Sequence, residues 1–161
     1  MKIRLCQPSD HAELHRINEE NVPAVGSVTH GELETLIAGC YATFVAEDDG
    51  RIGGFLLGLV EGADYGSPNY AWLSERYPAF AYVDRIAVDA TFQGSGIGAM
   101  LYDALEAHVA SKRPVLACEV NTLPPNPGSL RFHKRLGFEE VGEQVYEPGA
   151  KAVVYLVKTL V

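Results

Sequence analysis

The sequence predicts an α/β protein, with helices and strands interspersed along a chain of 161 residues. Three observations favour this class. Four segments have apolar residues at helical spacing, the short apolar runs between them are typical of buried strands, and an Asp-Asp-Gly turn joins two strands. A chain of this length can bury the core of one domain, so residues 1–161 are expected to form a single domain.

The first elements are a short strand and a helix. The stretch KIRLC predicts a strand over residues 2–6, and PSDHAELHRIN predicts a helix over residues 8–18. The acidic pair Asp10 and Glu13 has the spacing of a cap at the start of this helix.

A second helix and a hairpin follow. The helix over residues 29–39 begins with Thr29 and Glu32 at the spacing of a capping box. The Asp-Asp-Gly turn then predicts a β-hairpin that pairs Tyr41–Glu47 with Arg51–Val60.

The second half of the chain alternates strands and helices. Residues 62–78 are polar and aromatic, and are expected to form a long connection. The elements after it are a strand over 79–89, a helix from Ile97 toward Pro114, a strand over 115–120, a helix over 129–136, and strands over 138–145 and 151–160.

The composition excludes several classes of function. A net charge of −8 argues against a general nucleic-acid binder, which would carry a dominant basic face. The start of the chain has no signal-peptide pattern, and no apolar run is long enough to cross a bilayer. Cys6, Cys40 and Cys118 form neither a disulfide framework nor a zinc pattern. We therefore expect a cytoplasmic protein with no nucleic-acid or membrane partner and no metal.

A glycine-rich loop is the strongest local signal. The stretch FQGSGIGAMLYDAL places Gly94, Gly96 and Gly98 at alternate positions directly before a helical pattern. Glycines at this spacing let backbone N–H groups turn toward one point, and a helix start adds unpaired N–H groups and a positive dipole end. The natural ligand is a phosphate, and a tight turn without a ligand is the alternative.

Two families could account for this loop. The pattern Gly94-x-Gly96-x-x-Ala99 satisfies the dinucleotide fingerprint, and Glu119 lies where a ribose-binding acid would. That fingerprint should follow the first strand of a doubly wound sheet, whereas here five elements precede the loop. A nucleotide-dependent oxidoreductase is therefore the less favoured interpretation.

The other family fits nearly the whole chain. The stretch IAVDATFQGSGIGAMLYDAL resembles the acetyl-CoA motif of the GNAT superfamily of N-acetyltransferases, with Gln93, Gly96 and Gly98 at the motif positions. The stretch NPGSLRFHKRLGF is similar to the family's later segment, in which an Asn opens a helix that ends in Gly-Phe. The order of the elements also matches that of the family.

This resemblance implies a fold and a co-substrate. The fold would be a mixed, mostly antiparallel central sheet, flanked by about four helices and splayed between the strand before the loop and the strand VLACEV. Acetyl-CoA would bind in that gap. The residues expected to bind it are Ile86, Ala87, Val88, Gln93, Gly94, Ser95, Gly96, Ile97, Gly98, Asn126 and Ser129.

Acetyl transfer from a thioester to an amine requires a base, donors for the tetrahedral oxyanion, and a way to protonate or tolerate the leaving thiolate. By resemblance, the donors are the backbone N–H groups of Ile86 and Val88. Glu119 and Asp84 are rival bases on the two strands beside the gap. An ion pair, with Arg85 for Asp84 or with an arginine of the next helix for Glu119, is the alternative role.

His133 lies where many relatives have a tyrosine that protonates the thiolate. Histidine can also donate a proton to a thiolate, so His133 is the candidate acid, and a structural histidine is the alternative. Without the tyrosine, a non-catalytic acetyl-CoA-binding module is a second alternative. Cys118 is expected to be a small apolar residue of a buried strand rather than an acyl carrier.

The acceptor is predicted from the charge distribution. Residues 1–50, which should face the acceptor, carry nine acids and three bases, and a field of this sign attracts cations. The acids on or beside the two helices expected to flank the acceptor are Glu19, Glu20, Glu32 and Glu34. We expect direct transfer in a ternary complex to a small cationic primary amine, and a homodimer is compatible with the sequence.

Overall fold

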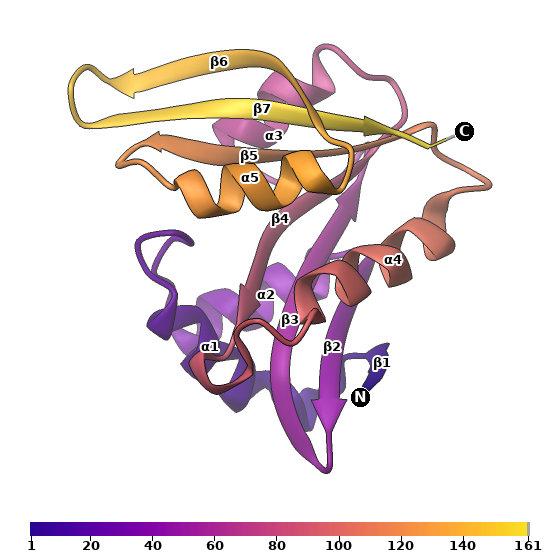
Figure 1. Cartoon of the computed structure of the whole chain (residues 1–161). Coiled ribbons are helices and arrows are strands. Elements are labelled where there is room, and N and C mark those ends of the chain that lie inside the picture. The colour runs from indigo at the N-terminus through magenta and orange to yellow at the C-terminus, as the bar shows by residue number, and fades with distance from the viewer. Residues whose placement is uncertain (161) are drawn as a thin grey trace.

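The protein is a seven-stranded sheet with helices on both faces (Figure 1). The computed structural model describes residues 1–160. In chain order the elements are β1 (Lys2–Leu5), the 3₁₀ turn η1 (Pro8–Asp10), α1 (His11–Glu20), α2 (His30–Gly39), β2 (Ala42–Asp48), β3 (Arg51–Val60), α3 (Pro68–Ser74), β4 (Ala81–Val88), the 3₁₀ turn η2 (Ala90–Phe92), α4 (Ile97–Val109), β5 (Val115–Leu123), α5 (Pro127–Arg135), β6 (Glu139–Glu147) and β7 (Lys151–Thr159).

The sheet consists of two half-sheets that share a narrow junction. The strand order is β1-β2-β3-β4-β5-β7-β6, and every neighbouring pair is antiparallel except β4 with β5. Within the described residues, β4 and β5 pair only through Ala81 with Leu116 and Tyr82 with Ala117. Beyond these pairs the strands diverge (Figure 1). The predicted splayed, mostly antiparallel sheet is confirmed, and it is not the doubly wound parallel sheet of a dinucleotide-binding fold.

Local sequence signals set the first half-sheet. β2 and β3 pair across the turn residues Asp49 and Gly50, whose φ angles of 50° and 79° are those of a type I′ turn. The capping box at the start of α2 is also present: Glu32 N–H donates to Thr29 Oγ1 at 3.1 Å, and Thr29 N–H donates to Glu32 Oε1 at 3.0 Å. The predicted hairpin and the predicted capping box are both confirmed.

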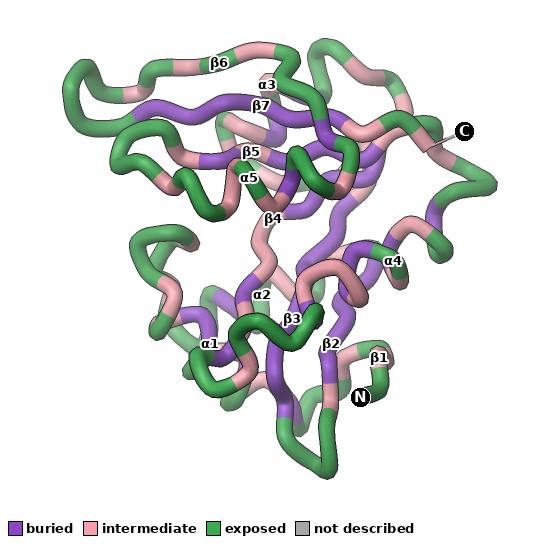
Figure 2. Tube along the Cα trace, viewed as in Figure 1, coloured by how far each residue is buried: buried purple, intermediate pink, exposed green. Residues whose placement is uncertain are grey.

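Helices cover the two faces unequally. α1 and α2 pack on one face of β2, β3 and β4, and α3 packs on the same face of the second half-sheet. α4 and α5 pack on the opposite face, around Leu101 and Leu105. Figure 2 shows that β7 is buried for most of its length and that the edge strand β6 is largely exposed. Within residues 1–160, no helix is both long and apolar enough to cross a membrane.

Two sequence-based expectations were wrong. Asp10 does not cap α1, because its carboxylate accepts hydrogen bonds from Arg4 at 2.8 and 3.0 Å and from the Gln7 N–H at 2.8 Å. The connection over residues 62–78 contains a fifth helix, α3. Ser67 caps its start and Pro68 occupies its first turn, a signal that the surrounding aromatic residues obscured.

Candidate active site

A large cavity lies where the half-sheets separate. Its volume is about 1160 Å³, which exceeds the usual range for a site that holds one drug-sized ligand. The cavity extends from the glycine loop before α4, between β4 and β5, to the α1–α2 loop and the turn between β6 and β7. Every residue proposed from the sequence for cofactor binding or catalysis lines it.

Two of the three loop glycines have backbone conformations that other residues rarely adopt. Gly94 and Gly96 have φ angles of 77° and 83°, and a Cβ on either would meet no atom within 4 Å. The first helical bond of α4 runs from Met100 N–H to Gly96 O. The backbone N–H groups just before Met100 therefore have no acceptor within the helix. Not every loop amide is free, since Ser95 N–H donates to Phe92 O at 3.2 Å.

Gly98 has a different role from the other two glycines. A Cβ at this position would lie 2.8 Å from the Phe132 ring of α5, so glycine permits α5 to pack against α4. On the sheet side, a Cβ on Gly53 would lie 2.8 Å from Ile97 Cδ1, so a glycine of β3 permits the start of α4 to approach the sheet. Close packing from both sides therefore fixes the position of the helix start.

The end of β4 presents backbone N–H groups to the gap. Asp89 N–H donates to Gly53 O of β3 at 2.8 Å. Because successive residues of a strand point their N–H groups to opposite edges, those of Val88 and Ile86 point away from β3, toward the diverging strand β5. Val88 O is consistent with this direction, since it accepts from Gln93 Nε2 at 3.3 Å and from Asn21 Nδ2 at 3.2 Å.

Asp84, on β4, is held in an ion pair. Arg85 Nε donates to Asp84 Oδ2 at 2.8 Å, and the Tyr65 hydroxyl donates to Oδ1. The side chains of Asp84 and Arg85 are 5% and 10% exposed. Arg85 Nη1 also binds Asn18 Oδ1 at 2.9 Å and Gly26 O at 3.0 Å, which ties the α1–α2 region to β4. Both oxygens of Asp84 are thus engaged in holding the site together.

Glu119, on β5, lies among neutral donors. The Tyr82 hydroxyl is 2.9 and 2.8 Å from Oε1 and Oε2, and Asn69 Nδ2 donates to Oε1 at 2.9 Å. Burial raises the pKa of Glu119 to about 8, and the negative charge of Asp84 adds to the increase. The hydrogen bonds from Tyr82 and Asn69 act in the opposite direction. Glu119 is therefore a carboxyl group that can exchange a proton near neutral pH.

His133, on α5, has both ring nitrogens engaged. Nδ1 lies 2.8 Å from Ser129 O, and because a carbonyl oxygen only accepts, Nδ1 carries the ring proton. Nε2 then accepts from the Tyr102 hydroxyl of α4 at 2.6 Å. Burial lowers the pKa of His133, which favours this neutral form. The ring N–H thus points at the backbone of its own helix.

Tyr102 and Cys118 line the cavity beside His133. Burial raises the pKa of Tyr102 and that of the Cys118 thiol well above their ordinary values. Cys118 is 2% exposed and belongs to the apolar cluster beneath α4. Its surroundings are those of a small apolar residue and do not favour a thiolate nucleophile.

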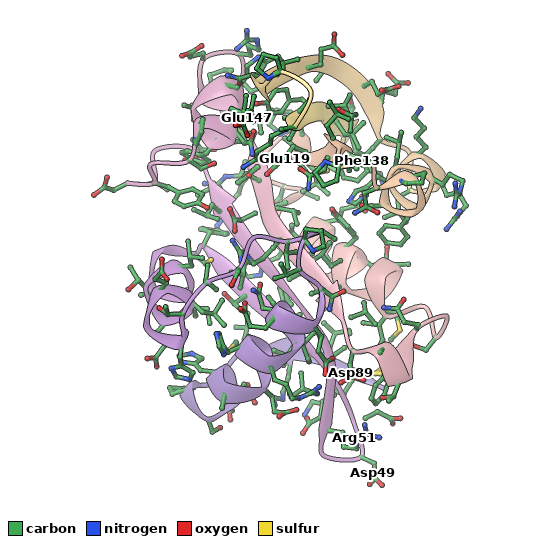
Figure 3. The ribbon with its side chains drawn as sticks, turned by 90° about the vertical axis from the view of Figure 1, so that its left-hand side faces the viewer. Asp49, Arg51, Asp89, Glu119, Phe138 and Glu147 are labelled. Carbon is green, nitrogen blue, oxygen red and sulfur yellow. The ribbon has the colours of Figure 1, made fainter. Side chains whose placement is uncertain are left out.

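The four carboxylates expected near the acceptor do not line the cavity. They make local contacts: Glu19 with Ser27, Glu20 with Arg16, Glu32 with the start of α2, and Glu34 with His11. The carboxylates that do line it are Asp84, Glu119 and Glu147. Figure 3 labels Glu119 and Glu147 at the same end of the molecule, remote from Asp49 and Arg51 at the tip of the first hairpin.

Sequence reasoning missed three polar side chains that surround these groups: Asn69, Tyr82 and Tyr102. Asn69 lies on the unexpected helix α3, whose Ser-Pro start was the available signal. Tyr82 and Tyr102 fall at apolar positions of a strand and a helix, where a buried tyrosine is indistinguishable by pattern from any other core residue.

A sheet that opens between two parallel strands, with a glycine-rich helix start and a carboxyl group on the same cavity, fits the class of acyltransferases. A family model agrees with this class. The model described as the Acetyltransferase (GNAT) family matches residues 11–138, and the chain belongs to this family. The protein is therefore an acyltransferase, of a family that uses acetyl-CoA.

Solved structures share the fold. A ribosomal-protein-alanine N-acetyltransferase from Brucella melitensis is 22% identical, with a TM-score of 0.73 over 99% of this chain and 100% of that one. An N-acetyltransferase from Staphylococcus aureus is also 22% identical, with a TM-score of 0.73 over 99% and 98%. An aminoglycoside 6'-N-acetyltransferase complexed with coenzyme A is 16% identical, with a TM-score of 0.75 over 100% and 98%. A comparison with curated proteins finds no significant match.

Proposed function

We propose that the protein transfers the acetyl group of acetyl-CoA to a small cationic primary amine, by direct attack within a ternary complex. The observation that carries this proposal is the continuity of one cavity, which joins the glycine loop to the Glu119 carboxyl group. Backbone N–H groups at a helix start suit the pyrophosphate of coenzyme A, and a titratable carboxyl suits removal of a proton from an amine. Because both half-sheets supply its walls, we also infer that the chain works as a single domain.

Coenzyme A would lie along the end of β4 and the start of α4. The amides around Gly94 and Gly96 would bind the pyrophosphate, and charge-assisted bonds of this kind contribute about 1.5–3 kcal/mol each. The N–H groups of Ile86 and Val88 would bind the pantetheine arm and the tetrahedral oxyanion. The remaining proposed contacts come from Ala87, Gln93, Ser95, Ile97, Gly98, Asn126 and Ser129, which line the same cavity.

Glu119 would act as the base, directly or through water. Its carboxylate would take one proton from the ammonium group. The neutral nitrogen would then attack the thioester carbon, form the new N–C bond and release its second proton to water. Collapse of the oxyanion breaks the C–S bond and releases the thiolate. Because the pKa of Glu119 is raised to about 8, the carboxylate is a stronger base than an ordinary glutamate and is better matched to an amine.

The leaving thiolate would be stabilised by a hydrogen bond rather than by proton transfer. The N–H of His133 is directed to Ser129 O, which leaves the Tyr102 hydroxyl as the movable donor. Because burial raises the pKa of Tyr102 well above its ordinary value, this hydroxyl would donate to sulfur and keep its proton. His133 would then contribute by orienting Tyr102, and the thiolate would take a proton from solvent.

The carboxylates expected to attract a cationic acceptor do not line the cavity, so the support for this class of acceptor comes from other residues. Asp84 is compensated by Arg85, whereas Glu119 has neutral partners and Glu147 lies on the cavity rim. The pKa of Glu119 is raised to about 8, so this carboxyl carries little charge at neutral pH. Glu147, which makes no ion pair among the described residues, would therefore supply most of the attraction for an ammonium ion, against Arg135 and Lys151 on the same cavity. The steering charge and the proton acceptor would therefore lie at the same end of the cavity.

A thermal-shift assay tests the cofactor site. Acetyl-CoA at a concentration well above its Kd should raise Tm by mass action, and NADH should not. Gly96→Leu should abolish the shift. Gly62→Leu is the matched control: Gly62 has a similar φ of 80°, equally open surroundings and no contact with the cavity. A shift that survives Gly96→Leu, or a shift with NADH alone, would contradict the proposal.

A turnover screen tests the acceptor. Acetyl-CoA consumption should be measured with polyamines, amino acids, aminoglycosides and N-terminal peptides. We expect the highest kcat/KM with a small polycation. A preference for neutral or acidic amines would contradict the proposed acceptor class while leaving acetyl transfer intact.

A further inference from the structure

Asn69 links the proposed base to the C-terminal hairpin. Its Nδ2 donates to Glu119 Oε1 at 2.9 Å, and its Oδ1 lies within hydrogen-bond distance of the hydroxyls of Tyr155, at 2.9 Å, and Tyr146. These four residues come from α3, β5, β6 and β7. The hydroxyl of Tyr155 has a single proton and also lies 2.9 Å from Gln144 Oε1, so the proton of Tyr146 is the one that we assign to Oδ1. The amide group then faces Glu119 with its NH₂ end.

The hydrogen bond from Asn69 leaves part of the Glu119 carboxylate free to accept a further hydrogen bond or a proton. An ionised carboxylate has about four acceptor positions, two on each oxygen. Asn69 occupies one position on Oε1, and the single proton of Tyr82 occupies one more on either oxygen. Oε2 therefore keeps at least one lone pair that no donor in the described part of the chain uses, on a side chain that lines the cavity.

The surroundings hold Asn69 and its partners rigidly. Tyr155 is 0% exposed, and its ring stacks on Trp72 of α3 with the ring centroids 4.0 Å apart. A Cβ on Gly142 of β6 would lie 2.4 Å from Trp72, so the hairpin packs directly on α3. Asn69 and the two tyrosines thus belong to one packed unit, in which the amide has little freedom to turn.

We propose that Asn69 is a positioning residue for the base: it holds Glu119 by Oε1, so that Oε2 faces the acceptor amine in the ionised state. The inference rests on the proposed function, since it takes Glu119 as the base. A hydrogen bond from an amide N–H favours the carboxylate over the carboxylic acid, which opposes the effect of burial on the pKa of Glu119.

The alternative role for Asn69 is to fasten α3 to the sheet. The neighbouring residue Tyr70 already does so, because its hydroxyl donates to Val60 O at 2.5 Å and accepts from Ala63 N–H at 2.9 Å. Tyr70 makes these bonds without touching Glu119. Tyr70→Phe is therefore a matched control, which weakens the attachment of α3 and leaves the carboxylate contact intact.

Carbon-13 NMR of protein labelled at the glutamate carboxyl groups tests the inference without an acceptor. The Glu119 signal is the one missing from Glu119→Gln. It should titrate near pH 8 in the original protein, at higher pH in Asn69→Ala, and unchanged in Tyr70→Phe. The other titratable groups around the carboxyl are the same in all three proteins: Tyr65, Tyr82, Asp84, Tyr102, Cys118, Tyr146 and Tyr155.

Two outcomes would overturn the role of Asn69: the same titration midpoint in Asn69→Ala and Tyr70→Phe, or the same midpoint in Asn69→Ala and the original protein. If Asn69→Ala does not fold, Tyr146→Phe serves instead, since it keeps the amide and removes one proton that orients it. This variant should also move the midpoint upward, by less than Asn69→Ala. An unchanged midpoint in Tyr146→Phe would then count against the inference.

Kinetics with the amine found by screening give a second readout. Asn69→Ala should lower kcat/KM about tenfold near pH 7 and much less near pH 9.5, with the KM for acetyl-CoA unchanged. A loss that is equal at all pH values would mean that Asn69 is structural. If Glu119→Gln has full activity, the proposed base is wrong, whatever the titration shows for Asn69. The two failures are thus distinguishable.

Discussion

The two walls of the cavity each carry one carboxylate, and the surroundings of these carboxylates are opposite. On β4, Asp84 is bonded to the guanidinium of Arg85 at 2.8 Å. On β5, the hydrogen-bond partners of the Glu119 carboxylate among residues 1–160 are the neutral side chains of Tyr82 and Asn69. One wall holds a carboxylate that is bonded to a cation, and the other holds a partly buried carboxylate that is not.

This difference indicates which carboxylate can act as a base. A buried carboxylate that is bonded to a cation is held by that partner, and removal of either one leaves the other charge buried and unpaired. A carboxylate that is largely removed from water among neutral donors has a raised pKa, and for Glu119 this raises the pKa to about 8. The side chains bonded to each carboxylate, rather than its position beside the gap, therefore distinguish Asp84 from Glu119 as candidate bases.

The largest expected effect is on catalysis. Glu119→Gln should lower kcat/KM by about 10²- to 10⁴-fold at neutral pH, the range usual for loss of a general base. Part of the rate should return at high pH, where the amine is already neutral. Measurement of pH–rate profiles for Glu119→Gln and Asp84→Asn side by side would check this. A pH-dependent loss in Asp84→Asn alone would exchange the roles of the two walls.

The next effect is on stability. Asp84→Asn leaves the largely buried Arg85 without its anion, which should cost about 3–5 kcal/mol of unfolding free energy. Glu119→Gln leaves no buried cation without a partner, so it should lower the free energy of unfolding by less than about 1 kcal/mol near pH 6. Urea denaturation measures both. Equal losses in the two variants would mean that the two walls do not differ in the way proposed.

The pH dependence of stability should also distinguish the walls. The folded-state pKa of Glu119 is raised from 4.5 to about 8, so its contribution to stability is complete below about pH 4.5 and is lost as pH rises toward 8. Compared with the original protein, Glu119→Gln should therefore become relatively more stable across this interval, by roughly 2 kcal/mol after allowance for solvent in the cavity. Urea melts at several pH values would measure it, and a constant difference would contradict the raised pKa.

The smallest effect concerns the rim. Glu147→Gln should raise the KM for a cationic acceptor by about two- to threefold at low salt, and the difference should vanish at high salt. Glu34→Gln is the control, because Glu34 is bonded to His11 and does not line the cavity. Steady-state kinetics at two ionic strengths would check this, and identical behaviour of the two variants would remove steering by Glu147.

Structural features that depend only on residues close together in the sequence could be predicted from it. The turn at Asp49 and Gly50 and the capping box of Thr29 with Glu32 are local, and both were correct. The separation of β4 from β5 came from the family resemblance alone, because it depends on a pairing between Tyr82 and Ala117 that no local pattern encodes. The cap expected at Asp10 was wrong because the nonadjacent Arg4 takes its carboxylate.

The candidate site also combines features that are local in the sequence with features that depend on distant residues. The positive φ angles of Gly94 and Gly96 follow from the loop itself. The restriction on Gly98 depends on Phe132, more than thirty residues away in the sequence, and is invisible without the packing of α5 on α4. The surroundings of Glu119 combine β4, α3 and β5, so only the folded chain decides between a salt bridge and neutral donors.

The divergence of β4 from β5 also determines how quickly backbone hydrogens are replaced by deuterium. Asp89 N–H is bonded across to β3 at 2.8 Å, whereas the amides of Ile86 and Val88 face a side of the strand where, in the described chain, no register pair with β5 exists. In deuterated water the latter two should exchange sooner than their neighbours. An acyl donor bound to them would slow that exchange. Residue-by-residue deuterium uptake would then identify the amides that the donor contacts, before any acceptor is known.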